Sequence, residues 1–364
     1  MKKNRISRRT FIGTTTVAAL GSSVFGMRNI YGGDLKHKPS KDIVSIVKVN
    51  NGDIRTAVEE AIDLLGGLKT VTKGQESIML KPNLVAPSRD YTTKVEVVKA
   101  VAQLMQKAGK NVLIGEGSAA APAFNVIDGE ICRTNKQNIL DGMQKSVFDA
   151  LGYTEMAASL NIPLINLHSG DIVEVKLKNG FAAKSVKIHK KLVDVDLVCS
   201  IPMMKTHSLA TVTLAMKNLI GLYPGTEYYA VRSWLHDRAA EKGSLGVAYE
   251  ILDMNQAVTT GLSIIDATSA MEGNGPSSGT LVDMGLIVAG TSPLATDMVG
   301  ATLMGFDISE IPFLKLAHET GMIPKLLEVI EIRGLHIAEC KRQFVKPDIF
   351  KWTDINKSWG AKEI

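Results

Sequence analysis

The sequence has 364 residues, of which 45% are hydrophobic and 22% are charged, and its formal net charge is +5. This length and composition are typical of a globular chain with one large or two modest domains, and they exclude an intrinsically disordered protein. Nucleic-acid binding has no support, because aromatic residues make up only 5% and no basic stripe is interleaved with them.

The first 31 residues are interpreted as an export signal. Ser7 to Gly13 (SRRTFIG) resembles the twin-arginine signature, and an apolar, small-residue stretch from Thr14 to Phe25 follows it. This stretch is too short and too polar for a typical membrane-spanning helix. We therefore expect the twin-arginine translocase as a partner, membrane contact through this segment alone, and a final location in the periplasm or cell envelope. A disordered basic tail is the alternative interpretation.

From Asp42 onward, apolar strand-like segments alternate with amphipathic helical segments. Strands are predicted at residues 43–49, 77–80, 111–114, 163–167, 195–201, 262–265, 285–289 and 329–332, and helices at 51–65, 95–107, 137–151, 228–254, 294–304 and 308–320. Residues 172–177 and 185–188 are predicted to form a β-hairpin. The pattern predicts an α/β fold, an open, mostly parallel twisted sheet with helices on both faces, plus a small β-hairpin insertion. The domain is expected at 42–334, in one or two lobes, with a C-terminal extension at 335–364.

The three cysteines give no metal-binding pattern. Cys132, Cys199 and Cys340 lie far apart in the sequence, and no C-x-x-C spacing occurs. The chain therefore has no visible ligand set for an iron–sulfur cluster or a structural zinc. The sequence assigns neither a metal nor an organic cofactor.

Polar clusters follow four of the predicted strands directly. They are Lys81-Pro82-Asn83, Glu116-Gly117-Ser118, Lys205-Thr206-His207 and Asp266. Because the carboxyl ends of parallel strands meet at one edge of a sheet, we expect these clusters to share one crevice. Taken singly, each cluster is also compatible with an ordinary loop.

Two of these clusters favour particular chemistry. Glu116 is a candidate general base, metal ligand or lysine partner, and Gly117 would let the backbone approach a ligand closely. The glycine spacing there is not G-x-G-x-x-G, so a dinucleotide site is weakly supported. On an extended loop Lys205 and His207 point to the same side, which suits an anion pocket or an acid–base pair. A structural role for His207 is the alternative.

Further candidates come from the segments around these clusters. Lys217 and Asn218 end a short helical segment, where the helix dipole alone also favours a lysine. His236 lies on a predicted helix with Arg232 and Arg238, a basic face that is more typical of solvent exposure. Glu272 begins a glycine-proline loop that follows Asp266 and could cover a ligand.

Several hydrolase motifs are absent from the sequence. It contains no H-E-x-x-H, no G-x-S-x-G and no P-loop. Zinc-protease, α/β-hydrolase and nucleotide-hydrolase functions are therefore not supported.

A set of ordered motifs resembles one known family. They are Lys81 to Asn83 (KPN), Thr92 to Val98 (TTKVEVV), Ile114 to Ser118 (IGEGS), Ile201 to Ser208 (IPMMKTHS), Met216 to Gly225 (MKNLIGLYPG), His236, Ile264 to Pro276 (IIDATSAMEGNGP) and Pro293 to Asp297 (PLATD). They resemble domain-of-unknown-function family 362 over most of residues 42–334. The family name implies no activity. Many relatives carry ferredoxin-like cysteine motifs, which this chain lacks, so an iron–sulfur role is not carried over.

A fainter likeness is to the lactate-racemase-type nickel-pincer proteins. Only Lys217, Pro224 and Gly225 align with that pattern, with His207 or His236 as acid–base groups. This likeness makes a distant relationship to those racemases an alternative hypothesis.

The leading hypothesis is an exported protein that binds a small anionic metabolite or cofactor at the strand carboxyl ends, with acid–base or redox chemistry. Lys81, Lys205 and Lys217 would bind the anion, Glu116 and Asp266 would act as bases or metal ligands, and His207 would move a proton. Asn83, Gly117, Ser118, Thr206, Asn218, His236 and Glu272 would complete the ligand contacts. A non-catalytic binding or maturation factor of the cell envelope is the alternative, so the sequence leaves enzymatic activity open.

Overall fold

The computed structural model describes residues 42–232, 235, 247–322, 324, 326–349 and 362–364. The expected export signal and His236 lie outside these residues. The strands are β1 (Ile43–Lys48), β2 (Ser77–Pro82), β3 (Asn111–Glu116), β4 (Val126–Ile127), β5 (Glu130–Ile131), β6 (Leu164–Asn166), β7 (Ile172–Lys176), β8 (Ser185–His189), β9 (Leu197–Ile201), β10 (Met203–His207), β11 (Thr211–Thr213), β12 (Thr260–Asn274), β13 (Ser278–Val282), β14 (Leu286–Gly290) and β15 (Glu331–Gly334).

The α-helices are α1 (Ile54–Leu64), α2 (Leu68–Val71), α3 (Val95–Lys107), α4 (Gln137–Ala150), α5 (Tyr153–Leu160), α6 (Lys191–Asp194), α7 (Ala215–Asn218), α8 (Gly225–Tyr228), α10 (Ala248–Ala257), α11 (Pro293–Leu303), α12 (Pro312–Glu319) and α13 (Ile337–Cys340). Short 3₁₀ helices lie at η1 (Arg89–Tyr91), η2 (Leu219–Leu222), η3 (Ala230–Arg232), η5 (Ile308–Glu310) and η6 (Leu327–Val329). Most predicted helices and strands appear within a few residues of their expected bounds.

The main sheet has the strand order β15-β1-β14-β12-β9-β2-β3-β6. The pairs β1–β15, β12–β9, β9–β2, β2–β3 and β3–β6 are parallel, whereas β14 runs antiparallel to both β1 and β12. The small hairpin predicted at residues 172–188 is formed by the antiparallel pair β7 and β8. The predicted α/β class, with a mostly parallel sheet, is therefore confirmed.

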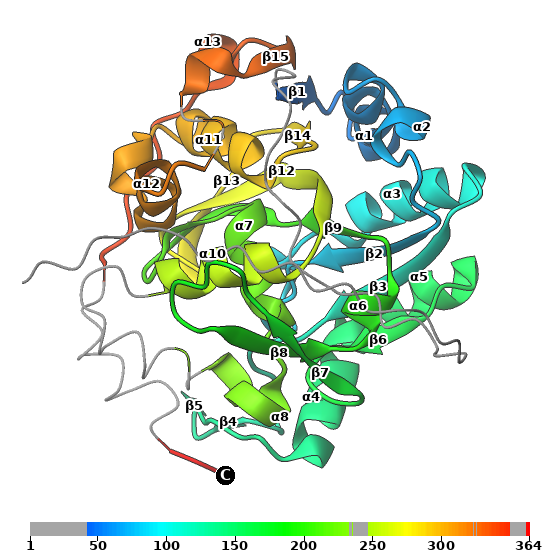
Figure 1. The fold of residues 1–364 in the computed structure, drawn as a ribbon, viewed down its shortest axis with the longest axis vertical. Coiled ribbons are helices and arrows are strands. Elements are labelled where there is room, and N and C mark those ends of the chain that lie inside the picture. Colours follow the sequence, from blue (N-terminus) through cyan, green and yellow to red (C-terminus); the bar gives the residue numbers. More distant parts are fainter. Residues whose placement is uncertain (1–41, 233–234, 236–246, 323, 325, 350–361) are drawn as a thin grey trace, which may run out of the picture. The chain divides into compact units, whose positions relative to one another are not determined.

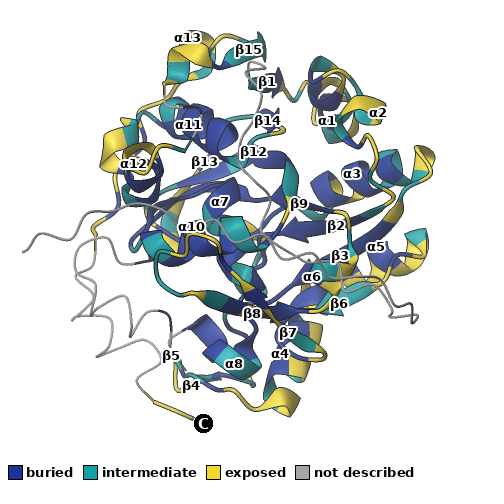
Figure 2. Ribbon diagram, in the orientation of Figure 1, coloured by how far each residue is buried: buried dark blue, intermediate teal, exposed yellow. Residues whose placement is uncertain are grey.

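Two hydrophobic clusters lie on opposite faces of the sheet. On β2, Ile78 and Leu80 belong to one cluster and Met79 to the other, as the two-residue period of a strand requires. The first cluster contains the buried stripes of α1, α3 and α4, and the second contains those of α7, α10, α11 and α12 (Figure 1). Figure 2 shows the central strands buried and the exposed residues on the outer sides of helices and turns. Helices therefore cover both faces.

Two local predictions are wrong. Residues 205–207 do not form a loop after a strand, because β10 pairs with β12 in parallel and with β11 in antiparallel fashion. The strand predicted to end at Asp266 continues for eight more residues to Asn274, and its distal half forms an antiparallel hairpin with β13. The expected glycine-proline loop is therefore reduced to the short turn between Asn274 and Ser278.

The predicted helix at 228–254 is only partly described. Residues 230–232 form η3 and residues 248–257 form α10. The backbone before the undescribed stretch is unusual, because Tyr229, Val231 and Arg232 have φ values of +62°, +61° and +56°. Non-glycine residues rarely adopt this left-handed conformation, so their surroundings must hold them there.

Candidate functional site

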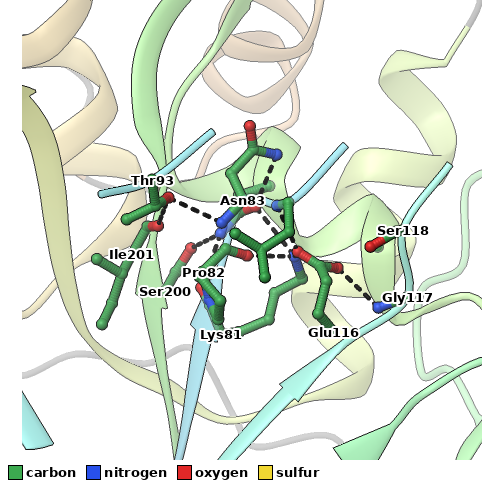
Figure 3. A network of polar contacts seen from close by, with 12 residues as sticks. Lys81, Pro82, Asn83, Thr93, Glu116, Gly117, Ser118, Ser200 and Ile201 are labelled. Atoms are coloured by element: carbon green, nitrogen blue, oxygen red, sulfur yellow. Dashed lines mark hydrogen bonds and ion pairs between the residues drawn. The ribbon is translucent and has the colours of Figure 1, made fainter. Parts of the chain in front are cut away.

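A buried ion pair joins the carboxyl ends of β2 and β3. These strands are parallel neighbours, with Leu80 opposite Ile114, so the last residues of the two strands meet. Lys81 Nζ lies 2.8 Å from Glu116 Oε2, and the two side chains are 1% and 2% exposed. Burial lowers the pKa of Lys81, and the attraction of Glu116 opposes that change. The structure therefore brings together the first two predicted clusters (Figure 3).

The Glu116 carboxylate has additional hydrogen-bond donors. Its Oε2 accepts from the backbone N–H of Leu84 at 2.9 Å, and its Oε1 accepts from the N–H of Gly117 at 2.8 Å. With the lysine, three donors thus use both oxygens, so the carboxylate fixes the turns after β2 and β3 (Figure 3). This arrangement supports a positioning role for Glu116 and matches the lysine partner among its predicted roles.

Asn218 connects α7 to the same ion pair. Its Oδ1 accepts from Lys81 Nζ at 3.1 Å and from Asn83 Nδ2 at 3.3 Å. Its Nδ2 donates to the Lys81 carbonyl at 3.0 Å and to Ser200 Oγ at 3.1 Å. Both ends of the amide are therefore occupied, and α7 is fixed against β2 and β9.

Asp297 holds the beginning of α7. Its carboxylate oxygens accept from the backbone N–H groups of Ala215 at 2.7 Å and Met216 at 2.9 Å. These groups have no partner within the helix, so a side-chain acceptor stabilises its first turn. Burial raises the pKa of Asp297 to about 8, and the two hydrogen bonds oppose that rise. Asp297 therefore stabilises the helix that follows β11 through two backbone contacts, although it lies on a different helix, α11.

Arg232 is buried at the other side of the ion pair. Its guanidinium donates to the carbonyls of Gly117, of Ser118 at 3.2 Å and of Gly221 at 2.8 Å. Burial lowers its pKa to about 10, and the charge of Glu116 opposes the change. The predicted solvated face for this arginine is wrong, because the left-handed backbone at residues 231 and 232 turns the chain towards the strand ends.

Close packing at this point depends on two glycines. A Cβ on Gly221 would lie 2.5 Å from Glu116 Oε1 and 2.7 Å from Lys81 Nζ, and a Cβ on Gly117 would lie 2.6 Å from Arg232 Nη2. Real Cβ atoms do not approach other atoms so closely. The absent side chains therefore allow the charged groups to lie directly against the backbone.

These residues enclose a cavity of about 100 Å³, here called the central cavity. This volume has room for several water molecules or a small ligand. The ionisable side chains in its wall are three lysine or arginine residues, one acid and one histidine. The wall consists of Lys81, Asn83, Leu84, Val85, Glu116, Gly117, Ala119, His207, Leu209, Thr213, Lys217, Asn218, Ile220, Gly221, Val231, Arg232 and Pro276.

Lys217 is the third cation that borders the central cavity, beside Lys81 and Arg232. Among the described residues its ammonium group has no hydrogen-bond or ion-pair partner, and the side chain is only partly buried because it borders the cavity. Burial lowers its pKa from 10.5 to about 7, and the charges of Arg232 and Lys81 contribute to this change. Lys217 therefore exchanges between ammonium and amine near neutral pH.

Other polar atoms of the wall are also unsatisfied. Asn83 Oδ1, Thr213 Oγ1 and Arg232 Nε are buried and have no hydrogen-bond partner within residues 42–232, 235, 247–322, 324, 326–349 and 362–364. Buried polar atoms are nearly always paired, and each exception requires an explanation such as a ligand or water. One acceptor, one hydroxyl and one donor thus remain available around the central cavity.

Of the β10 cluster, only His207 borders the cavity. Its Nδ1 accepts from the N–H of Leu209 at 3.0 Å, which places the proton of the neutral ring on Nε2. Lys205 Nζ instead donates to the carbonyls of Tyr91 at 2.6 Å and Pro276 at 3.3 Å, and Thr206 Oγ1 donates to Gly273 at 2.7 Å. Lys205 and Thr206 therefore support the wall without lining it.

Three other predicted site residues do not line the cavity. Asp266 accepts from the backbone N–H of Lys94 at 2.9 Å and from the Thr268 hydroxyl at 2.6 Å, which anchors the start of α3. Burial raises its pKa. Glu272 Oε2 accepts from the N–H of Val345 at 3.0 Å, and Ser118 donates its N–H to a glutamine and leaves its hydroxyl unpaired. Asp266 and Glu272 therefore do not reach the cavity, because their carboxylates are held by backbone N–H groups elsewhere, at the start of α3 and at Val345.

Thr213, Gly221 and Arg232 were not predicted as site residues. A lone hydroxyl, a glycine within MKNLIGLYPG and an arginine in a basic stretch carry no distinctive spacing. The positions of Thr213 on β11 and of Arg232 after a left-handed turn are set by tertiary structure alone.

Within the residues that the structure describes, no three histidine, cysteine or acidic side chains gather where one metal ion could be held. In the same part of the chain, no helix is both long and apolar enough to span a membrane. The three cysteines are unpaired.

Comparisons with known proteins identify related sequences. Residues 78–302 match the family described as Domain of unknown function (DUF362). A thylakoid-associated protein of Synechocystis, sll1697, is 28% identical over 281 residues, which cover 76% of this chain and 78% of that protein. The matched family region contains every residue that lines the central cavity.

A solved structure was also compared. The lactate racemase apoprotein from Thermoanaerobacterium thermosaccharolyticum aligns with a TM-score of 0.44 and 14% identity, over 74% of this chain. The chain spans 57% of the length of that protein.

Proposed function

Because this chain belongs to the family Domain of unknown function (DUF362), whose description names no activity, we propose from its own side chains that it binds a small organic anion in the central cavity. The observation that carries the proposal is Lys217, a cation that borders the cavity and has no hydrogen-bond or ion-pair partner among the residues the structure describes.

The charges of the wall favour an anion. Lys81 and Glu116 neutralise each other. Within the described part of the chain, Arg232 donates to carbonyl groups alone and Lys217 has no hydrogen-bond or ion-pair partner. An opposite charge in the cavity would offset the cost of burying these cations. A carboxylate bound there would raise the pKa of Lys217 again, since it stabilises the ammonium form.

The size and the unpaired atoms narrow the class of ligand. A cavity of about 100 Å³ suits a carboxylate with few heavy atoms and is small for a nucleotide. Asn83 Oδ1 can accept from a ligand hydroxyl, while Arg232 Nε can donate to a ligand oxygen. These features favour a short hydroxy or oxo acid.

His207 is the candidate for proton transfer. It borders the cavity, and its neutral ring carries the proton on Nε2. We propose that it donates or accepts a proton at the bound acid, which would make the protein an enzyme. A non-catalytic binder of the cell envelope would use the same cavity without this step.

Calorimetric titration of the purified protein with acetate, propionate, lactate, pyruvate and phosphate tests the proposal. Lys217→Met should weaken binding of the preferred carboxylate by about 10- to 100-fold, which corresponds to losing a charged hydrogen bond. Lys145→Met is the matched control, because Lys145 is an exposed lysine paired with Asp149. If none of these anions binds, or if both variants bind like the unmodified protein, the proposal is wrong.

A second measurement separates catalysis from binding. Nuclear magnetic resonance in D₂O reports exchange of the hydrogens beside the carboxylate of the bound acid. A catalytic His207 predicts that His207→Gln keeps the affinity and loses this exchange. Absence of exchange in the unmodified protein, with binding retained, favours the non-catalytic alternative.

We also propose that the chain is exported by the twin-arginine route, on the basis of Arg8 and Arg9. Replacing both with lysine should leave the protein in the cytoplasm of its producing cell. Cell fractionation measures this, and unchanged export of the variant would refute the assignment.

A further inference from the structure

The side chain of Lys217 differs from the other basic groups around the central cavity. Lys81 donates to Glu116, to the Pro82 carbonyl and to Asn218, and Arg232 donates to three carbonyls. Among the described residues Lys217 has no such partner, although the helix that carries it is fixed at both ends. Its nitrogen therefore lies at the cavity and can bind a ligand, through its lone pair as an amine or through its protons as an ammonium group.

Such a nitrogen is suited to act as a nucleophile. An amine attacks a carbonyl carbon only in its neutral form, which burial and nearby cations favour. Lys217 has both conditions, since its pKa is lowered to about 7 by burial and then by Arg232 and Lys81. Lys81 is less suited to this role, because its nitrogen already donates to Glu116, to the Pro82 carbonyl and to Asn218.

We propose that Lys217 forms an imine with a small 2-oxo acid bound in the central cavity. The inference rests on the proposed anion binding and adds a substrate class to it. A 2-oxo acid combines the carboxylate that the positive wall favours with an adjacent carbonyl carbon for the amine. The unpaired Thr213 hydroxyl and Arg232 Nε are available donors for its oxygens.

The atoms balance without a further reagent. The lone pair of the neutral Lys217 amine forms the C–N bond, the π pair of the carbonyl moves to oxygen, and one proton passes from nitrogen to that oxygen to give a carbinolamine. The C–O bond then breaks as the nitrogen lone pair forms the second C–N bond. The hydroxyl leaves with the second nitrogen proton as one water molecule, which gives the neutral imine. No oxidant or reductant takes part.

Reductive trapping tests the inference. The full chain is incubated at neutral pH with pyruvate or glyoxylate and sodium cyanoborohydride, then digested and mapped by mass spectrometry. We expect one reduced adduct on the peptide that contains Lys217, formed at least about tenfold faster than on an average exposed lysine. Lys217→Arg should abolish this adduct and retain anion binding, since arginine keeps the charge and lacks the nucleophile. Lys145→Arg should leave the adduct unchanged.

The controls distinguish the two proposals. Binding of propionate and pyruvate by calorimetry, without a trapped adduct, would overturn imine formation and leave anion binding intact. An adduct spread evenly over exposed lysines would also overturn it. Trapping at Lys217 by neutral propanal as readily as by pyruvate, with no carboxylate binding, would retain the nucleophile but overturn both the oxo-acid class and the proposed function. Because the mapping is done on the unmodified chain, the result does not depend on whether a variant folds.

Discussion

Replacing Lys81 with methionine and Glu116 with glutamine, singly and together, is expected to show strong coupling between the two residues. Each single change leaves the partner buried and without its counter-charge, which costs about 3–5 kcal/mol of unfolding free energy. The glutamine amide also cannot accept from both backbone N–H groups now bound to Glu116, which adds about 1–3 kcal/mol. In the double variant no unpaired charge remains. We therefore expect it to be more stable than the sum of the single losses by about 1–3 kcal/mol.

Guanidinium unfolding followed by circular dichroism measures the four free energies of this cycle. The control is the pair Lys145 and Asp149, whose side chains are 75% and 41% exposed and lie four residues apart on α4. Its coupling should be about 0.3–0.5 kcal/mol. If the losses of unfolding free energy from the Lys81 and Glu116 changes add, or if their coupling is no greater than that of the exposed pair, then the buried ion pair does not stabilise the contact between the ends of β2 and β3.

Three further predictions concern the surroundings of the ion pair. Gly221→Ala should destabilise the protein by about 1–3 kcal/mol in the same unfolding assay, because its Cβ would overlap the ion pair; an unchanged free energy would contradict that packing. Asp297→Asn should cost about 1–3 kcal/mol, since an amide nitrogen cannot accept from the N–H groups that begin α7, and equal stability would exclude this role. Carboxylate affinity should be highest below about pH 7 and decrease as the pH rises through 7, because Lys217, with its pKa lowered to about 7, loses its positive charge there. Calorimetry across this range should show the decrease. The Lys217→Arg variant should show no such decrease, because arginine keeps its charge.

The fold was largely predictable because its elements carry local signals. Apolar residues recur along α1 with the helical period, and an apolar run marks the strand that leads to Lys81, so both elements can be predicted from the sequence. The alternation of helices and strands then predicts parallel pairing. The end of β12 could not be predicted in this way. Most of its distal residues are small or polar. They form a strand because β10 and β13 pair with them, and this pairing joins segments that are distant in the sequence.

The site was predictable only where strand direction determined it. Lys81 and Glu116 meet because each lies at the end of a parallel strand, and that geometry follows from the sheet. Lys205 was predicted to bind the anion, but its ammonium group is held by two carbonyls. Lys205 is held by carbonyl groups of Tyr91 and Pro276, which are distant in the sequence. No local sequence pattern therefore indicates that Lys205 is held in this way and that Lys217 borders the cavity. For the same reason, the position of Arg232 was not foreseen.

Two consecutive residues of the short helix α7, Lys217 and Asn218, have different roles. Asn218 uses both ends of its amide to join strands, so a change there should weaken the whole domain. Lys217 makes no such contact among the described residues, so its side chain can change with little cost to folding. A relative that keeps the asparagine and has another residue before it would keep the fold and bind a different ligand. The ligand specificity of this site can therefore evolve at position 217 without loss of stability, because Asn218 makes the contacts that hold the strands together.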